Sequence, residues 1–313
     1  MYIIGIDLGG TNIAGAILDQ NYGIIAKNSV KTIADQGFEP ILNSIKGLID
    51  SLLKEQNLSY KDIARIGIGS PGTIDSKKGV VIYANNLSLL NAPLAPKLSE
   101  LTGIPVKISN DANCAALGES VAGGAKGMKN MVLITLGTGV GGGVVIDKKI
   151  YEGTLSVGTE LGHIVIMANG KKCSCGRIGC WEAYASASAL ISQTLAAIEK
   201  HPECLMAKQA KDGVKVNGRL AFDCAKAGDE TAAAVVKEYV QYVACGIINI
   251  INIFFPDAIL VGGGISGEGD YLLDPIRELV KNYSYGSAYV QCPQILKATL
   301  GNDAGIIGAA ALQ

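Results

Sequence analysis

The sequence contains few aromatic residues, few histidines and no excess of charge of either sign. Phe, Trp and Tyr make up only 5% of its 313 residues, with a single Trp, and there are two His. The 27 Lys and Arg residues are balanced by 28 Asp and Glu residues, so the formal net charge is −1. This balance argues against nucleic acid or an anionic membrane as a partner.

Long apolar runs and low-complexity linkers are also missing. No unbroken apolar run approaches the roughly 18 residues that a bilayer span needs, and the first residues resemble a strand rather than a signal peptide. We therefore expect a cytoplasmic protein. The composition is 49% hydrophobic with 40 glycines, which is typical of a compact globular chain rich in turns. Its length predicts two domains or lobes.

A strand–glycine turn–strand unit occurs twice in the chain. Residues 7–19 (DLGGTNIAGAILD) and residues 135–147 (TLGTGVGGGVVID) share Leu, two Gly and Asp at positions that lie 128 apart. Glycine turns let backbone N–H groups approach phosphate oxygens because no Cβ intervenes. The pattern indicates a duplicated fold with one phosphate-binding hairpin per lobe. The alternative is a chance likeness of two glycine-rich hairpins.

Between and after these hairpins the chain alternates predicted helices and strands, which indicates an α/β fold. We expect helices over residues 41–53, 183–200 and 229–255, and strands over 63–68, 106–109 and 258–261. A Gly-Gly-Gly turn around Gly263 follows the last of these strands. It fits either close approach of a phosphorylated ligand or a plain turn. Residues 207–220 are the most loop-like stretch.

Asp111 lies where a predicted strand ends and a helix begins. It fits a helix N-cap, which Asp often provides. It equally fits a catalytic carboxylate, since a helix N-terminus stabilises the ionised form. The two interpretations are compatible.

Three of the eight cysteines gather within eight positions, and one of the two histidines lies ten positions upstream. Three thiolates and one imidazole would close a tetrahedral zinc site without an open position, so such a zinc would be structural. The alternative is three reduced loop thiols and an unrelated histidine. The predicted ligands are His163, Cys173, Cys175 and Cys180. A zinc ion there would also fix the carboxylates of Glu160 and Glu182.

These motifs together resemble the ROK family of sugar kinases. The resemblance rests on residues 7–11 (DLGGT), 69–72 (GSPG), 110–113 (NDAN), 136–143 (LGTGVGGG), 160–163 (ELGH) and 173–182 (CSCGRIGCWE), in family order across nearly the whole chain. It implies a two-lobed, actin-like (ribonuclease H-like, duplicated) ATPase fold with ATP and sugar in the interlobe cleft. We expect residues 1–121, joined by a C-terminal helix at about 302–313, to form the small lobe, and 122–301 the large lobe with the zinc loop.

The resemblance also implies roles for individual residues. Asp111 would be the general base that accepts the proton of the attacking sugar hydroxyl, and Asp7 would help to hold Mg²⁺. The sugar would be bound by Gly72, Asn86, Asn110, Asp111, Glu160, His163 and Glu182. The nucleotide would be bound by Asp7, Gly9, Gly10, Thr11, Asn12, Thr138, Gly139 and Gly263. His163 would serve both zinc and sugar through its two ring nitrogens. One departure is Thr159, where the family often has Gly or Ala, and this puts the identity of the sugar in doubt.

The resemblance implies an ATP- and Mg²⁺-dependent sugar kinase, commonly a homodimer, with a structural zinc. Glucose is the first expectation for the acceptor, and N-acetylmannosamine, N-acetylglucosamine and fructose are alternatives. A non-catalytic, sugar-sensing regulator of the same family is a rival interpretation. We expect it to carry a DNA-binding segment before the first strand, which here begins at Tyr2. An actin-like assembly ATPase is a second rival, and it has no use for a polyol pocket.

Overall fold

The computed structural model describes residues 1–154 and 156–313, and it divides into two compact units. Unit 1 comprises residues 1–133, 143–159 and 299–313, and unit 2 comprises 134–142 and 160–298. We had expected the division at residue 121. Residues 143–159 belong to unit 1 because Gly143 packs directly on helix α3 (Asp111–Val121) and the Glu152 carboxylate accepts hydrogen bonds from Ser76 and Ser109.

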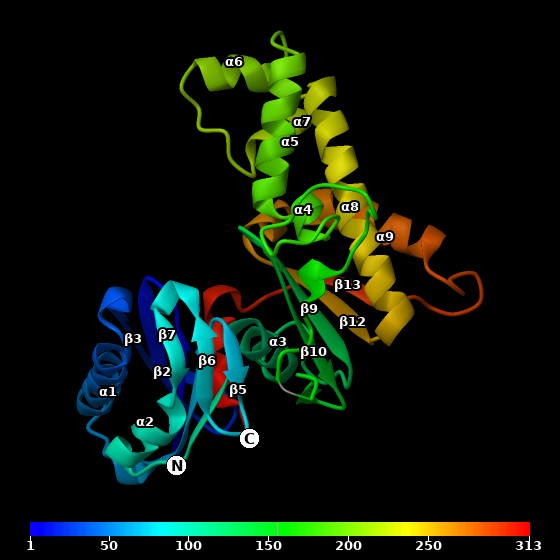
Figure 1. Cartoon of the computed structure of the whole chain (residues 1–313). Helices are drawn as coiled ribbons and strands as arrows, with labels where there is room; N and C mark the ends of the chain where they lie inside the picture. The colour runs from blue at the N-terminus through cyan, green and yellow to red at the C-terminus, as the bar shows by residue number, and fades with distance from the viewer. Residues whose placement is uncertain (155) are drawn as a thin grey trace. The chain divides into compact units, whose positions relative to one another are not determined.

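Unit 1 is built on a five-stranded sheet of order β3-β2-β1-β4-β8. Its strands and helices, with a small β5-β6-β7 sheet, are β1 (Tyr2–Leu8), β2 (Asn12–Leu18), β3 (Ile24–Lys31), η1 (Ala34–Gln36), α1 (Phe38–Glu55), η2 (Tyr60–Asp62), β4 (Ile63–Ser70), β5 (Thr73–Asp75), β6 (Val80–Ala84), η3 (Asn85–Leu87), β7 (Leu89–Ala92), α2 (Leu94–Thr102), β8 (Val106–Asn110), α3 (Asp111–Val121), η6 (Gly301–Asp303) and α10 (Ala304–Ala310). Figure 1 labels its strands β2 and β3 and the helices α1 and α2.

The two faces of strand β1 pack against different helices. Ile4 and Ile6 belong to the core that α1 and α2 cover, whereas Ile3 packs with Ile306 and Ile307 of α10. This alternation follows from the two-residue period of a strand. The predicted helix over residues 41–53 is confirmed as part of α1, and its seven apolar residues from Ile41 to Leu53 are all buried.

Glycines let helix α10 pack closer to its neighbours than a Cβ atom at the same positions would allow. A Cβ added at Gly308 would lie 1.6 Å from the carbonyl oxygen of Cys114 in α3, and one at Gly67 would lie 1.7 Å from that of Ala309. The segment before α10 is held by Glu119, whose carboxylate accepts hydrogen bonds from the backbone N–H groups of Thr299 and Leu300, both at 2.8 Å. The last residues of the chain therefore complete the core of unit 1.

A second five-stranded sheet has the order β11-β10-β9-β12-β13 and repeats the arrangement of the first. Its strands are β9 (Met131–Leu136), β10 (Val140–Ile146), β11 (Lys149–Ile150), β12 (Ala258–Gly262) and β13 (Gln294–Lys297). Leu8 and Leu18 end β1 and β2, and the residues 128 positions later, Leu136 and Ile146, end β9 and β10. The predicted internal repeat is confirmed.

Unit 2 gathers its helices around the long helix α8. The helices are η4 (Leu161–His163), α4 (Glu182–Ala185), α5 (Ala187–Lys200), α6 (Leu205–Lys211), α7 (Leu220–Lys226), α8 (Glu230–Phe254), η5 (Gly264–Glu268) and α9 (Asp270–Tyr283), of which α4, α5, α7 and α9 contact α8. Of the predicted helix over 183–200, Ser186 separates α4 from α5 because its side chain caps α5. Residues 205–211 form a helix, so the loop predicted over 207–220 is wrong at its start.

Helix α8 is long and apolar enough to cross a membrane by length and composition alone. Core helices pass the same test, and 56% of its most apolar 18-residue window is buried in the protein. Its buried residues, which include Tyr239, Val243 and Ile250, line the core of unit 2. Within the described residues, no other helix meets the criteria of length and hydropathy.

Candidate functional site

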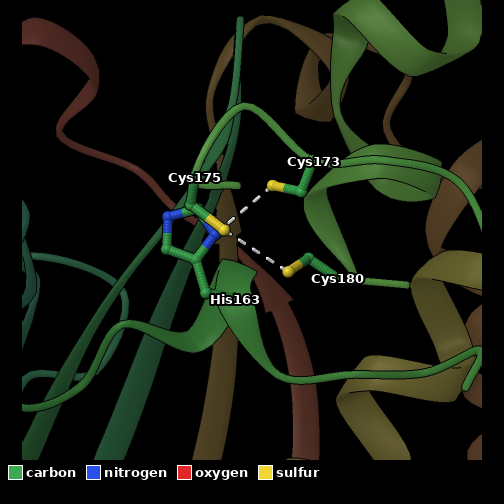
Figure 2. A group of neighbouring side chains, drawn as sticks. All are labelled: His163, Cys173, Cys175 and Cys180. Carbon is green, nitrogen blue, oxygen red and sulfur yellow. Dashed lines mark hydrogen bonds between the residues drawn. The ribbon is translucent and has the colours of Figure 1, made fainter. Parts of the chain in front are cut away.

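The side chains of His163, Cys173, Cys175 and Cys180 converge on one point of unit 2 (Figure 2). Their four ligand atoms all lie within 4.8 Å of one another. The Cys175 and Cys180 sulfurs are 3.7 Å apart, and the Cys173 sulfur is 3.7 Å from Nδ1 of His163. Ligand atoms around a tetrahedral zinc with Zn–S bonds of about 2.3 Å are separated by about 3.5–3.8 Å. The donor set and its spacing therefore fit zinc.

Backbone hydrogen bonds, and not the four converging side chains alone, shape this loop. The Cys173 N–H donates to the Arg177 carbonyl at 2.8 Å, and the Gly176 N–H donates to the Cys173 carbonyl at 3.0 Å. At Gly179, where φ is +82°, an added Cβ would lie 1.8 Å from the Met167 carbonyl oxygen. Only a glycine fits there. The turn that it allows brings Cys180 back beside Cys175.

Trp181 anchors the loop in the core of unit 2. The side chain is fully buried, and its indole N–H donates to the Tyr242 carbonyl in α8 at 2.8 Å. Gly246 in α8 leaves room for the ring, since a Cβ there would lie 2.0 Å from it. Because Trp181 stands between Cys180 and Glu182, it fixes the direction of both neighbouring side chains. Nothing in the local sequence pattern predicts this anchoring role of Trp181.

Glu182 lies over the second glycine hairpin as well as beside the cysteines. Its Oε2 accepts a hydrogen bond from the Val140 N–H at 3.0 Å, and its Oε1 accepts one from the Ser174 hydroxyl at 3.2 Å. A Cβ at Gly139 would lie 2.3 Å from Oε2. The structure thus brings Glu182, predicted to bind sugar, together with Gly139, predicted to bind the nucleotide.

Glu160 and His163 are separated by one short turn, η4. The His163 N–H donates to the Glu160 carbonyl at 3.0 Å, and the Glu160 side chain is exposed. Because His163 turns Nδ1 toward the cysteines, Nε2 is the ring nitrogen that remains for another partner. The predicted contact of His163 with sugar would therefore use Nε2.

The second glycine hairpin is held at both of its central carbonyls. The Ala187 N–H donates to the Gly137 carbonyl at 2.8 Å, and the Ser188 hydroxyl donates to the Thr138 carbonyl at 2.8 Å. Gly263 packs against the backbone of Leu136, the residue that ends β9 directly before the hairpin turn. Its φ is +80°, and an added Cβ would lie 2.5 Å from the Leu136 carbonyl oxygen. Close packing and the positive φ therefore explain the glycine at position 263 without a ligand.

In unit 1, Asn110 rather than Asp111 caps helix α3. The Asn110 side-chain oxygen accepts hydrogen bonds from the N–H groups of Ala112 and Asn113 at 2.9 and 3.3 Å. Asp111 is the first helical residue, and its Oδ1 accepts from the Ala112 N–H at 2.8 Å. The capping interpretation of Asp111 is therefore wrong. Burial raises the pKa of Asp111, which these backbone hydrogen bonds partly counter.

The carboxyl group of Asp7, near the end of β1, is a weaker acid than an ordinary aspartate. Burial and the nearby charge of Asp111 raise the pKa of Asp7 to about 6, although Lys27 acts in the opposite direction. Gly305 packs against this carboxylate, since an added Cβ would lie 3.2 Å from its Cγ. The two carboxylates that the sequence assigned to catalysis and to Mg²⁺ therefore influence each other within unit 1.

The first glycine hairpin is fixed by Thr32, the residue that follows strand β3. Its N–H donates to the Thr11 carbonyl at 2.9 Å and its hydroxyl to the Gly9 carbonyl at 2.7 Å. Gly10 lies against Asn86, because an added Cβ would be 3.2 Å from its Nδ2. The hairpin, which includes Asn12 at the start of β2, is thus adjacent to a residue predicted to bind sugar.

Gly72 is held by two independent contacts. Its φ is +93°, and an added Cβ would lie 2.2 Å from the Tyr83 carbonyl oxygen, so only glycine fits. Its own carbonyl accepts a hydrogen bond from Nδ2 of Asn110 at 3.3 Å. Two residues predicted to contact sugar are therefore directly bonded to each other.

Thr159, the departure noted in the sequence, adopts a left-handed conformation with φ of +65°. A β-branched residue rarely tolerates this region, whereas Gly does so freely. The Thr159 hydroxyl lies 2.6 Å from the Gly158 carbonyl oxygen and 3.3 Å from Oδ1 of Asn113, both of which can accept from it. These contacts compensate for the strain immediately before Glu160.

The comparisons with known proteins decide the family. Residues 3–313 match the ROK family. The chain belongs to the ROK family. It is 38% identical over 308 residues to a glucokinase of Halalkalibacterium halodurans, a match that covers 98% of this ROK chain and 93% of the relative.

Solved structures agree with the fold of this ROK protein. A ROK family glucokinase from Streptomyces griseus, in complex with glucose and AMPPNP, is 34% identical with a TM-score of 0.79, covering 99% of this chain and 98% of its own. A ROK family transcriptional regulator, a homologue of the E. coli MLC protein, is 26% identical with a TM-score of 0.85, covering 99% and 76%. The expected α/β, two-lobed actin-like fold is confirmed.

Proposed function

We propose that this ATP-dependent hexose kinase uses glucose as its acceptor and forms glucose 6-phosphate. The main support is the similarity to glucokinases along nearly the whole chain, at 36% identity for that of Streptomyces coelicolor and 38% for that of Halalkalibacterium halodurans. The position of Asp111 supports the phosphoryl-transfer reaction itself. Because Asn110 provides the cap, the Asp111 carboxylate remains available for a substrate hydroxyl.

In this mechanism Asp111 is the general base. It accepts the proton of the sugar hydroxyl as the hydroxyl oxygen forms a bond to the γ-phosphorus, and the bond to ADP breaks in line. The remaining hydroxyls are bound by Gly72, Asn86, Asn110, Glu160, His163 and Glu182. Catalysis then depends mainly on positioning and on stabilising charge, because phosphoryl transfer needs little covalent help from the protein.

The two glycine hairpins bind the phosphates of ATP through backbone N–H groups. Residues 9–12 form the first hairpin, and Thr138 and Gly139 lie in the second, with Gly263 nearby. Mg²⁺ prefers carboxylate oxygens, and Asp7 follows a buried strand at the end of which it can hold the ion. When bound, Mg²⁺ neutralises charge on the transferring phosphate.

A panel of acceptors tests the choice of glucose. We expect kcat/KM for glucose, measured as ADP release in a coupled assay, to exceed that for N-acetylmannosamine, N-acetylglucosamine and fructose by about 10-fold or more, as good differential contacts to one sugar allow. A higher value for an N-acetylated sugar or fructose would assign the chain to that substrate. Sugar binding without ADP release from any sugar would favour a sugar-sensing regulator instead.

The pH dependence of Mg²⁺ use tests Asp7. Because the pKa of Asp7 is raised to about 6, a proton competes with Mg²⁺ below that pH, and the apparent Mg²⁺ constant should rise about fourfold between pH 7.5 and 5.5. ATP titrates in the same range, so an Asp7→Asn variant supplies the contribution of ATP alone. Equal pH profiles for the two proteins would remove Asp7 from this role.

Zinc at His163, Cys173, Cys175 and Cys180 completes the proposal. Its part is structural, since four protein ligands leave no open position. It would hold His163 directly and orient Glu182 through the short Cys180–Glu182 link. A cytoplasmic location and a homodimer stay predictions from the sequence.

Metal removal tests the zinc proposal. We expect one zinc per chain by elemental analysis, and a zinc-free preparation should unfold at lower temperature and show a glucose KM raised by roughly 10-fold or more. Cys180→Ser should have the same effects, whereas Cys292→Ser, outside the cluster, should have neither. An unchanged glucose KM after zinc removal would contradict the structural role.

A further inference from the structure

A cavity of about 650 Å³ lies in unit 1, and none of the residues predicted to bind sugar or nucleotide lines it. Four lysines surround it: Lys77, Lys107, Lys148 and Lys149. Part of its wall is apolar and consists of Ile108, Leu117 and Leu312. The size is within the range of small-molecule sites, which combine apolar walls with a few polar groups.

The four lysines outnumber the acidic side chains that line the cavity. Among the residues that the structure describes, none of them forms an ion pair. Two carboxylates, Asp147 and Glu152, also line the cavity. Glu152 already accepts hydrogen bonds from the hydroxyls of Ser76 and Ser109. The cavity therefore offers positive charge to an anion.

One of these lysines, Lys148, lies in a strained turn, and Lys149 follows it as the first residue of β11. Asp147 and Lys148 connect β10 and β11 and both have positive φ, at 49° and 63°. Such two-residue turns normally use glycine at the second position, so Lys148 is a costly choice there. The turn is held by the Asn130 side chain, which accepts from the Asp147 N–H at 2.9 Å, and by the Lys129 carbonyl. Retained strain of this kind often marks a ligand clamp.

We propose that this cavity binds a small phosphorylated metabolite. The ammonium groups of Lys107, Lys148 and Lys149 receive the phosphate, since lysine is a common point-charge ligand for phosphate. The carbon skeleton packs against Ile108, Leu117 and Leu312. The cavity is lined by none of the residues assigned to the kinase reaction, and only the blocking of the kinase site in the test rests on glucose as the proposed acceptor.

The cavity is close in the chain to the catalytic base. Ser109, which lines it, lies two residues before Asp111, and Leu117 belongs to the helix that Asp111 begins. The Cys114 thiol, buried within this helix, has its pKa raised by burial first and then by the charges of Asp111, Asp7 and Glu152. A ligand in the cavity would therefore lie beside the strand and the helix that carry Asp111.

Calorimetric titration of the full chain with glucose 6-phosphate tests this site. Saturating glucose and Mg²⁺–AMPPNP are present, so that binding at the kinase site is blocked, and the ionic strength is low to limit screening. We expect saturable binding to the unmodified protein and at least ~10-fold weaker binding to the Lys148→Gln/Lys149→Gln variant, because hydrogen bonds to charged groups are among the strongest. Inorganic phosphate should bind more weakly than the sugar phosphate, since it lacks the carbon skeleton.

The matched control is Lys208→Gln/Lys211→Gln, which removes the same charge from the exposed surface of α6. It should bind glucose 6-phosphate within about twofold of the unmodified protein, and circular dichroism should show all three proteins folded. Equal weakening in both double variants would reduce the effect to net charge and overturn the proposal. So would undiminished binding in Lys148→Gln/Lys149→Gln, or phosphate binding as tightly as the sugar phosphate.

Discussion

An Asp111→Asn variant should lose about 10³-fold or more in kcat while glucose still binds. General base catalysis contributes about 10²–10⁴-fold, and asparagine cannot accept the proton of the hydroxyl. The substitution keeps the size of the side chain, and its amide oxygen can still accept the hydrogen bond that Ala112 N–H now donates. Because Asn110 is the helix cap, helix α3 should begin at the same residue in the variant.

The measurement is steady-state ADP release together with equilibrium glucose binding, which separates the chemical step from affinity. Asp35→Asn supplies the matched control, since Asp35 is exposed in η1 and the same charge is removed. That variant should retain its kcat. Appreciable turnover by Asp111→Asn would remove Asp111 from the role of base, and a loss of both turnover and glucose binding would point to positioning instead.

A Gly308→Ala substitution should destabilise unit 1 by about 3 kcal/mol, the upper end of the usual cost of overpacking. The new Cβ would lie 1.6 Å from the Cys114 carbonyl oxygen and 2.7 Å from the Gly118 nitrogen. These are backbone atoms of α3, so no side chain can rotate away, and α3 and α10 must separate. Calorimetry and urea denaturation should both show the loss.

Gly47→Ala is the control for this prediction. Gly47 also lies inside a helix, α1, but no atom comes within 4 Å of an added Cβ. Alanine should therefore stabilise the protein by about 0.5–1 kcal/mol, because glycine is the poorer helix former. The same substitution is thus expected to have opposite signs at the two sites. Similar effects at both would show that helix propensity, and not close packing, dominates.

Patterns local in sequence predicted much of the fold. The spacing of 128 residues between the glycine hairpins is reproduced by two sheets of the same strand order, because a strand, a glycine turn and a returning strand are specified within some 13 residues. Helix α1 was likewise predictable, since seven apolar residues share one face. The clustering of Cys173, Cys175 and Cys180 with His163 followed from ligand chemistry.

Contacts distant in sequence could not be predicted. Thr32 and Ser188 hold the two hairpins from other strands and helices, and nothing in their own neighbourhoods indicates this role. The cap of α3 was assigned to the wrong member of an Asn110–Asp111 pair, because both residue types cap helices well and only the backbone decides. Trp181 could have been suspected from its position as the one Trp beside a cysteine cluster.

Unit 1 combines residues that are far apart in the sequence, and this has a consequence for synthesis on the ribosome. One face of the sheet around β1 is covered by α10, which belongs to the last 15 residues of the chain. Until that helix has been synthesised, Ile3 lacks its contacts with Ile306 and Ile307, whereas unit 2 draws only on residues 134–142 and 160–298. We therefore expect unit 2 to be complete before unit 1 during synthesis, and the nascent N-terminal sheet to expose apolar surface until α10 has been made.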